Sequence, residues 1–332
     1  MIRKVWKLAR RPVGDIADSD LELVNEALPE LADGQFLLAV IYMSLDPTNR
    51  IWMSDQEQYM PPVELGAPMR AGVCGRVVSS RKAGVEPGQI MAGLGEWADH
   101  IISDGSFMSP LPQLPGVPLA ASYGTLALVG PTAYFGLLDI GQPKPGETLV
   151  VSAAAGGVGQ IVGQIGKIKG CRVIGIAGGP EKCDWVKRVA GFNDCIDYKN
   201  THLATALKQL CPNGIDVYFD NVGGDILNVA IENLALHARV VLCGLMAQYN
   251  GASPSQLNAG LLIRSRATVR GLVVYDHWQH MQQMTKELGA FYQAGQLHFR
   301  EDIQHGLTQA PAAFCRLMRG ENQGKSVVLL DN

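Results

Sequence analysis

Small residues at positions 153–159, with the sequence AAAGGVG, have the types and spacing that could bind a phosphate group. A phosphate needs backbone N–H groups that it can approach without a Cβ atom in the way, at the positive end of a helix. Gly156 and Gly159 stand at the second and third glycine positions of the G-x-G-x-x-G fingerprint, and Ala154 replaces the first. Glycines also mark ordinary turns, so the motif carries weight only between a strand and a helix.

The residues on both sides of this turn supply that context. Residues 147–152 are short, apolar and β-branched, as in a buried parallel strand, and residues 157–169 continue with helical spacing. A strand, a glycine turn and a helix form the phosphate-binding unit of a dinucleotide-binding fold. We therefore predict that the turn binds the pyrophosphate of a dinucleotide.

The end of the next predicted strand, residues 172–177, bears on the choice of nucleotide. A site that selects NAD places Asp or Glu there to bind the ribose hydroxyls, and this sequence has GGP at residues 178–180. Lys182 follows at the start of the next helix, where it could bind a 2′-phosphate; a solvated lysine beside Glu181 is the alternative. The missing acid and the cation together favour NADPH, because an acid would repel the phosphate.

Two further turns follow predicted strands. They are DNVGG at 220–224 and CG at 243–244, after the fourth and fifth strands. A doubly wound sheet places its ligand at the carboxyl ends of its strands. These turns are predicted cofactor contacts, with ordinary connecting turns as the alternative.

These turns can lie close together only if strands and helices alternate along this part of the chain. Strand-like segments lie at 147–152, 172–177, 194–197, 216–220, 239–243 and 269–273, and helical segments lie between them at 157–169, 181–190, 201–210 and 225–236. This alternation predicts a parallel sheet that helices cover on both faces. Six strands with the phosphate turn after the first match the doubly wound dinucleotide fold.

The first 120 residues have a different pattern. Strand-like runs at 35–44 and 72–79 indicate β structure, and a proline-rich connection follows at 109–118. The strand-like run 325–330 is predicted to return to this first domain. A length of 332 residues also favours two domains, which we predict at 1–120 with 299–332, and at 121–298.

The composition excludes several classes of function. With 47% hydrophobic and 18% charged residues, the chain can bury a sizeable core. A net charge of −3 without a basic run argues against binding to nucleic acid or to an anionic membrane. No signal peptide or transmembrane span is visible, and the seven scattered cysteines never form C-x-x-C. A cytoplasmic protein with reduced thiols is therefore expected.

The sequence lacks the residue patterns that catalysis by a metal or by a serine nucleophile requires. A catalytic zinc site needs three Cys, His or acidic ligands, and Cys74 has no histidine nearby in the sequence. His277 and His280 share one helical face, which a surface helix explains more simply. No G-x-S-x-G elbow is present. We expect no metal.

Several segments together resemble a known family. They are RPVG at 11–14, LDP at 45–47, the turn at 153–159, AGGPEK at 177–182, FDNVGG at 219–224 and QYN at 248–250, in this order. The sequence resembles the zinc-independent medium-chain dehydrogenase/reductases over nearly its whole length. Within them it is most similar to the group of prostaglandin reductases, leukotriene hydroxydehydrogenases and bacterial curcumin reductases.

This resemblance implies an α/β protein. A GroES-like, β-rich catalytic domain combines the N-terminal part with the C-terminal tail, and a Rossmann domain with a doubly wound parallel sheet lies between them in sequence. The implied activity is NADPH-dependent reduction of the C=C bond of α,β-unsaturated ketones or aldehydes. Zinc-dependent relatives carry Gly-His-Glu and a four-cysteine lobe, whereas this chain has LGAPMR at 65–70 and no cysteine at 92–112. The family often forms homodimers, and residues 268–274 are an apolar candidate for a paired edge strand.

The resemblance also implies a set of site residues. Carried over position by position, the cofactor contacts are Ala155, Gly156, Gly157, Val158, Gly159, Lys182, Tyr198, Asn221, Cys243, Gly244, Tyr249, Leu272, Val273, Val274 and Asn322. Hydride transfer to the β-carbon creates an enolate, whose oxygen needs a hydrogen-bond donor. Without a metal, tyrosine hydroxyls or the ribose hydroxyl of the cofactor are the available donors. Tyr249 and Tyr59 are the candidate catalytic donors, and packing on the nicotinamide or the core is the alternative role for such a tyrosine.

One segment departs from the family pattern. The family usually continues Asp-Pro with Tyr-Met-Arg, and this chain has Thr48, Asn49 and Arg50 there. Two small polar residues in place of an aromatic ring and a thioether should change the shape and polarity of the substrate pocket. The substrate is left open by this departure. A quinone reductase of the same superfamily, an alcohol dehydrogenase and an NADPH-binding protein without turnover are the alternatives.

Overall fold

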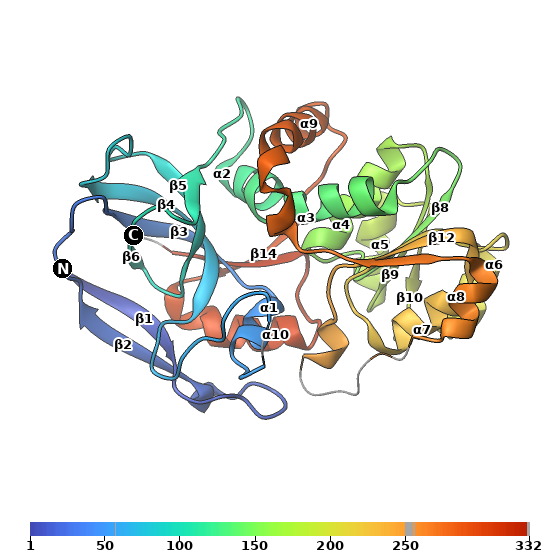
Figure 1. Cartoon of the computed structure of the whole chain (residues 1–332), viewed down its shortest axis with the longest axis horizontal. Helices are drawn as coiled ribbons and strands as arrows, with labels where there is room; N and C mark the ends of the chain where they lie inside the picture. Colours follow the sequence, from blue (N-terminus) through green and yellow to red (C-terminus); the bar gives the residue numbers. More distant parts are fainter. Residues whose placement is uncertain (57, 250–254, 256, 331–332) are drawn as a thin grey trace. The chain divides into compact units, whose positions relative to one another are not determined.

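The structure is a computed structural model, and it describes residues 1–56, 58–249, 255 and 257–330, with the side chains of Asp18 and Trp278 excepted. It divides into two compact units (Figure 1). The first unit consists of Met1–Gln113, Pro118–Tyr123 and Glu301–Asn332, and the second consists of Leu114–Val117 and Gly124–Arg300. The chain therefore begins and ends in the same unit.

A six-stranded parallel sheet is the centre of the second unit. In spatial order its strands are β10 (Asp194–Asp197), β9 (Arg172–Ala177), β8 (Thr148–Ser152), β11 (Ile215–Asp220), β12 (Leu234–Leu242) and β13 (Thr268–Gly271). The order reverses between β8 and β11, as in the doubly wound dinucleotide fold. The predicted α/β fold with a doubly wound parallel sheet is confirmed.

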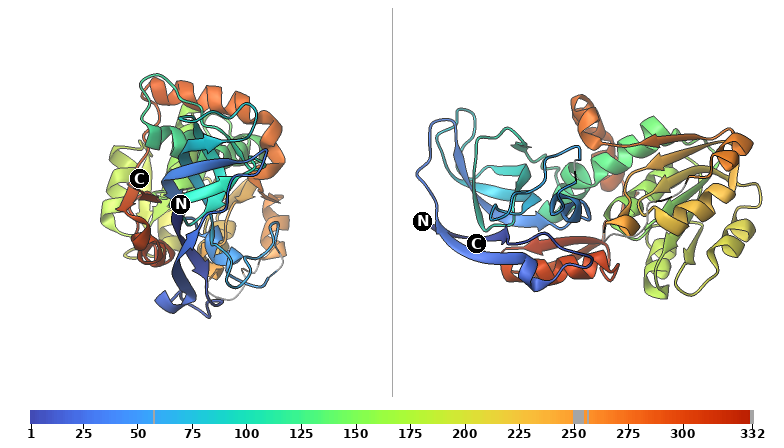
Figure 2. Two further views of the ribbon diagram at one scale, coloured as in Figure 1. Left: turned by 90° about the vertical axis from the view of Figure 1, so that its left-hand side faces the viewer. Right: turned by 60° about the horizontal axis from the view of Figure 1, so that its bottom comes forward.

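The side chains of this sheet are apolar on both faces. Val151, Phe219 and Val241 belong to the buried cluster on one face, and Val150, Tyr218 and Val240 belong to the cluster on the other. Successive side chains of a strand point to opposite faces, so helices have to cover both. Figure 1 and the right-hand view of Figure 2 show helices on both sides of the sheet.

The predicted helices are present with small changes at their ends. They are α4 (Gly157–Ile168), α5 (Pro180–Arg188), α6 (Leu203–Leu210) and α7 (Gly224–Glu232), followed later by α8 (Ala259–Ser265) and α9 (Met281–Gln293). The helix predicted at 225–236 ends early because β12 already begins at Leu234. Before the sheet, α3 (Gly130–Phe135) packs against α4.

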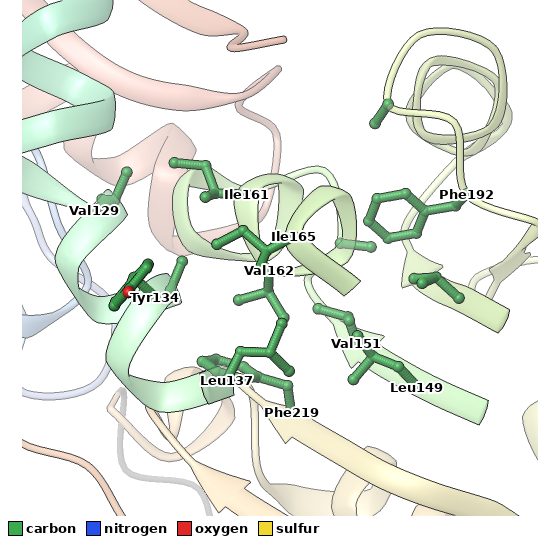
Figure 3. Close-up of a cluster of buried hydrophobic side chains, with 14 of the residues drawn as sticks. Val129, Tyr134, Leu137, Leu149, Val151, Ile161, Val162, Ile165, Phe192 and Phe219 are labelled. Carbon is green, nitrogen blue, oxygen red and sulfur yellow. The ribbon is translucent and has the colours of Figure 1, made fainter. Parts of the chain in front are cut away.

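Helix α4 packs closely on its neighbours because glycines line the contact. A Cβ atom on Gly159 would lie 2.3 Å from the carbonyl oxygen of Ala153, and one on Gly163 would lie 1.8 Å from Cζ of Phe192. Val162 and Ile165 then fill the space toward the sheet (Figure 3). This packing sets the N-terminus of α4 directly after the end of β8.

Two buried glutamines of α4 bind the end of the second unit. The Gln160 side chain accepts from the N–H of Arg300 at 2.8 Å and donates to its carbonyl at 3.1 Å. Gln164 does the same with His298, at 2.7 Å and 2.9 Å. The side-chain amides thus act as peptide groups toward residues 298–300, as a neighbouring strand would.

The first unit is rich in β structure. Its seven-stranded sheet has the order β14 (Glu301–His305), β15 (Lys325–Leu329), β3 (Phe36–Ser44), β4 (Arg70–Ser80), β5 (Ile90–Glu96) and β7 (Met108–Pro110), with β6 (His100–Ser103) also paired to β3. A separate hairpin consists of β1 (Ile2–Leu8) and β2 (Leu21–Ala27), and the helices are α1 (Thr48–Trp52), α2 (Leu119–Ala121) and α10 (Ala310–Met318). The predicted return of the C-terminal strand is confirmed, since β15 pairs with β3.

We predict that Gly163→Ala destabilises the second unit. The new Cβ would overlap the ring of Phe192, and overpacking costs about 1–3 kcal/mol, against a gain in helix propensity of at most about 1 kcal/mol. Denaturant unfolding should therefore show a net loss of up to about 2 kcal/mol in the free energy of unfolding. Gly271→Ala, whose Cβ would have no atom within 4 Å, is the matched control.

A double variant separates packing from other causes. Phe192→Leu should absorb part of the loss when it is combined with Gly163→Ala, because the two side chains compete for one space. Strictly additive losses in the double variant would contradict this explanation.

Candidate cofactor-binding site

The chain leaves β8 through a tight turn that explains its small residues. Ala153 has a left-handed backbone with φ 47°, and its carbonyl accepts the N–H of Gly156 at 2.9 Å. Ala154 is fully buried, and its N–H donates to the carbonyl of Ile176 on β9 at 3.0 Å. The left-handed residue of the turn is thus Ala153, one position before Ala154, which replaces the first glycine of the fingerprint.

The first turn of α4 presents backbone N–H groups without a side-chain cap. Ala155 and Gly159 are buried toward the sheet, and Gly156, Gly157 and Val158 are half-buried. The first N–H groups of a helix have no partner within it, and the helix dipole adds partial positive charge. A pyrophosphate would satisfy these groups, so the turn fits the dinucleotide that the sequence predicts.

A buried carboxylate organises the turn after β11. Asp220 accepts hydrogen bonds from the hydroxyls of Ser152 and Tyr218, each at 2.9 Å, and from the N–H groups of Val222 at 3.2 Å and Gly223 at 2.9 Å. Burial raises the pKa of this carboxyl, and the four donors oppose that shift because they bind the charged form. The carboxylate joins the ends of β8 and β11, where the strand order reverses.

Asn221, Cys243 and Gly244 extend this junction. The N–H of Asn221 donates to the Ser152 hydroxyl at 2.8 Å, and its side-chain amide donates to the Ser152 carbonyl at 2.7 Å. The carbonyl of Asp220 accepts the N–H groups of Cys243 at 2.8 Å and Gly244 at 3.2 Å. Burial raises the pKa of Cys243 to about 12, so the thiol is protonated at neutral pH and is a poor nucleophile.

Tyr249 follows a short helical turn, Met246–Gln248, and lies beside the end of β12. Its hydroxyl oxygen accepts the N–H of Leu245 at 2.9 Å, and it would lie 3.5 Å from a Cβ on Gly244. The phenol is therefore held at the same edge of the sheet as the turn after β8. Asn250, the last residue of the QYN motif, lies outside the described residues.

Lys182 and Tyr198 are predicted to select the nucleotide, and both lie beside the turn that follows β9. A Cβ on Gly178 would lie 3.0 Å from Cε1 of Tyr198, whereas one on Gly179 would have no atom within 4 Å. Tyr198 is 42% exposed at the end of β10, and Lys182 is half-buried in the first turn of α5. Both side chains therefore come to one turn from different elements.

A carboxylate that the sequence argument missed also lies at this turn. Asp197 accepts the N–H groups of Gly179 at 2.8 Å and Lys199 at 3.1 Å, and the amide of Asn200 at 2.8 Å. Burial works against its charge, but these hydrogen bonds prevail and lower its pKa. Its position could have been found from the register, because Asp197 pairs with Ala177 across the two strands.

Leu272, Val273 and Val274 follow the edge strand β13. The N–H of Leu272 donates to the carbonyl of Leu242 at 3.0 Å, and Leu272 and Val274 pack partly against the buried core. The carbonyl of Val273 accepts the N–H of Asp276 at 3.2 Å. These residues lie next to the turn after β12, as a cofactor contact would require.

Two predicted site residues belong to the first unit. Tyr59 is 52% exposed, and its hydroxyl lies 2.9 Å from the hydroxyl of Thr48. Asn322 is buried, and its amide donates to the carbonyl of Gly324 at 2.7 Å. Thr48, one of the residues that departs from the family pattern, therefore contacts a predicted catalytic tyrosine.

Asn49, the other departure, has a different environment. Its side chain is fully buried, accepting the N–H of Asp46 at 2.7 Å and donating to the carbonyl of Arg70 at 2.8 Å. Both polar ends of the amide are thus used inside the protein. Asn49 stabilises the turn before α1, and only Thr48 remains as a candidate for the substrate pocket.

Neither a metal centre nor a membrane span is found in the described part of the chain. Within it, no group of three or more His, Cys, Asp or Glu side chains is arranged to hold a metal ion. The same residues include no helix that is long and apolar enough to cross a bilayer. His277 lies 3.0 Å from the carboxylate of Asp139 and stacks on the ring of Phe135.

Known proteins resemble this chain over almost its full length. Residues 4–111 match the family described as the N-terminal domain of oxidoreductase, and residues 157–290 match the zinc-binding dehydrogenase family. The NADPH-dependent curcumin reductase of Escherichia coli is 40% identical over 97% of this chain and 95% of its own. Prostaglandin reductase 1 of Bos taurus is also 40% identical, over 98% of each chain.

Solved structures that resemble this chain belong to similar proteins. The crystal structure of CurA in complex with NADPH from Vibrio vulnificus has a TM-score of 0.93 and 41% identity, and the match covers 99% of both chains. A quinone oxidoreductase of Pseudomonas syringae shares the fold, with a TM-score of 0.80 at 23% identity over 99% of this chain and 100% of the other. The chain belongs to the medium-chain dehydrogenase/reductase family, in the group that contains the curcumin and prostaglandin reductases.

Proposed function

We propose that this chain is an NADPH-dependent oxidoreductase that reduces the C=C bond of α,β-unsaturated ketones or aldehydes without a metal. The observation that carries the proposal is its 40% identity, over 97% of the chain, to an NADPH-dependent curcumin reductase. The uncapped N-terminus of α4 supports it, since this turn can bind the pyrophosphate. We assign residues 1–120 with 299–332 to the GroES-like catalytic domain, and residues 121–298 to the Rossmann NADP-binding domain.

The proposed roles of the side chains follow from the chemistry. NADPH, when bound, supplies a hydride from C4 of its nicotinamide to the β-carbon of the substrate. The substrate oxygen then gains negative charge and needs a donor aimed at it. Tyr249 is the first candidate, because Leu245 holds its hydroxyl in place. Tyr59 is the second, and Thr48 contacts its hydroxyl.

An activity assay tests the reaction class. Purified protein should oxidise NADPH when a linear enone is added, and dialysis against a strong chelator should leave the rate unchanged. Turnover with a quinone but not with an enone would assign the protein to the quinone reductases. Loss of activity on chelation and its recovery with zinc would contradict the metal-free mechanism, and no turnover with any acceptor would indicate a binding protein.

We also propose a cytoplasmic homodimer joined along β13. This strand lies at the edge of the sheet, and such edges are normally covered or paired. Two-fold pairing is the commonest solution. Light scattering at micromolar concentration should give twice the mass of one chain, and the mass of a monomer would contradict the assembly.

Replacing Lys182 by alanine should weaken NADPH use selectively. A charge-assisted hydrogen bond to the 2′-phosphate contributes about 1.5–3 kcal/mol, which corresponds to roughly a 10- to 150-fold increase in KM. KM for NADH should hardly change, because NADH lacks the phosphate. High salt should reduce the difference, since the half-buried lysine is partly screened.

The control for this variant is another cation of the same helix. Lys187→Ala removes a lysine that lies 3.9 Å from Asp194, and it should leave both KM values unchanged. Equal losses for NADPH and NADH in Lys182→Ala would instead assign Lys182 to the stability of α5. A wild-type protein that used both cofactors equally would refute the proposed selectivity.

Tyr249→Phe should lower kcat while the affinity for NADPH changes little. Loss of one donor to a developing oxyanion costs about 100- to 1,000-fold in rate. Stopped-flow reduction of an enone, measured alongside the thermal stability of the variant, distinguishes catalysis from loss of the Leu245 contact. Tyr59→Phe is the comparison: a loss below about threefold for Tyr249→Phe together with a large loss for Tyr59→Phe would move the role to Tyr59.

A further inference from the structure

Two cysteines meet at the open edge of the parallel sheet. Cys183 lies in the first turn of α5 and Cys195 on the edge strand β10, and their Sγ atoms are 3.2 Å apart. Gly175, which pairs with Cys195 on β9, makes room for this contact, because a Cβ there would lie 3.2 Å from the Cys195 sulfur. A disulfide bond is about 2.0 Å long, so the two sulfur atoms need to approach by only about 1.2 Å.

A surface cavity gives access to both sulfur atoms. Cys183 and Cys195 are 6% and 9% exposed, and both line a cavity of about 610 Å³ between α5 and α6. Lys187 of α5 also lines this cavity. The pair is therefore shielded from large reagents but open to a small solute.

The two thiols of the pair differ from each other, because the pKa of Cys183 is lowered whereas the hydrogen bond to Cys183 and burial raise that of Cys195. The hydrogen bond from Cys195 lowers the pKa of Cys183, and Lys187 acts in the same direction. The thiolate is the nucleophilic form of cysteine, so Cys183 is the member of the pair that attacks. By contrast, burial raises the pKa of Cys74 to about 12 and that of Cys171 to about 11.

We propose that Cys183 and Cys195 are an oxidisable dithiol, which a hydroperoxide converts to a disulfide that weakens NADPH binding. The Cys183 thiolate attacks one peroxide oxygen and becomes a sulfenic acid. The O–O bond breaks, and the other oxygen leaves as water or an alcohol with the proton that Cys183 had released. The sulfur of Cys195 then attacks that of Cys183. The S–S bond forms, the S–O bond breaks, and the hydroxyl leaves as water with the Cys195 proton. Two electrons pass from the two thiols to the hydroperoxide.

The position of the pair couples it to the nucleotide. Lys182 immediately precedes Cys183, and β10 continues from Cys195 to Asp197, which holds the N–H of Gly179. Drawing α5 toward β10 therefore shifts Lys182 relative to the turn after β9. This coupling rests on the proposed role of Lys182 toward the 2′-phosphate. Binding of NADH, which lacks that phosphate, should not respond.

The experiment uses the full-length protein treated with hydrogen peroxide. After the remaining thiols are blocked with N-ethylmaleimide, peptide mass spectrometry should find Cys183 linked to Cys195, lighter by two hydrogen atoms, and dithiothreitol should reverse the link. Fluorescence titration should then show a Kd for NADPH raised by about 3- to 10-fold, a part of what one charge-assisted hydrogen bond contributes. The Kd for NADH should be unchanged.

Variants provide the controls. Cys183→Ser and Cys195→Ser should each abolish the link and make NADPH binding insensitive to peroxide, whereas Cys171→Ser should retain both responses. Absence of the linked peptide in the wild-type protein would overturn the proposal, and this readout requires no variant to fold. A link that leaves NADPH affinity unchanged would refute the coupling. If Lys182→Ala also left NADPH affinity unchanged, the fault would lie in the proposed role of Lys182 instead.

Discussion

The candidate site depends on the buried carboxylate of Asp220. A buried charge loses its hydration and is tolerated only when hydrogen bonds replace the lost water, which the two hydroxyls and two N–H groups around Asp220 do. Ser152 belongs to β8, and the backbone carbonyl of Asp220 binds the turn after β12. Three strand ends are therefore held in one geometry. The N-terminus of α4 and the turn that carries Tyr249 share this frame.

Most of the second unit could be predicted because short stretches of sequence identify its strands and helices. Buried parallel strands appear as continuous apolar runs, and β9 and β10 begin and end where the pattern indicates. The phosphate turn is predicted from its glycines even though an alanine, Ala153, occupies its left-handed position. What the residues cannot show is register. Asp197 reaches the nucleotide turn only because β10 pairs with β9, and Cys183 meets Cys195 only because a helix packs on an edge strand.

The first unit was less predictable because polar residues are buried in it. Arg3 lies inside the hairpin β1–β2 with Glu26 and Glu96 at 2.6 Å, so the strand lacks the apolar alternation that would identify it. Asn49 was expected near the substrate, yet both ends of its amide are bound inside the protein. In each case a hydrogen-bonding partner distant in sequence decides where the side chain lies.

The two glutamines of α4 should protect two backbone amides of this unit from hydrogen exchange. Residues 298–300 have neither helix nor strand conformation, but the N–H groups of His298 and Arg300 are bound by buried side chains. Such amides exchange with deuterated solvent only when the surrounding structure opens. Their exchange rates therefore report whether α4 is packed against residues 298–300. Gln160, which binds the amide of Arg300, lies in the first turn of α4, next to the phosphate turn, so these two amides are natural probes of events at that turn.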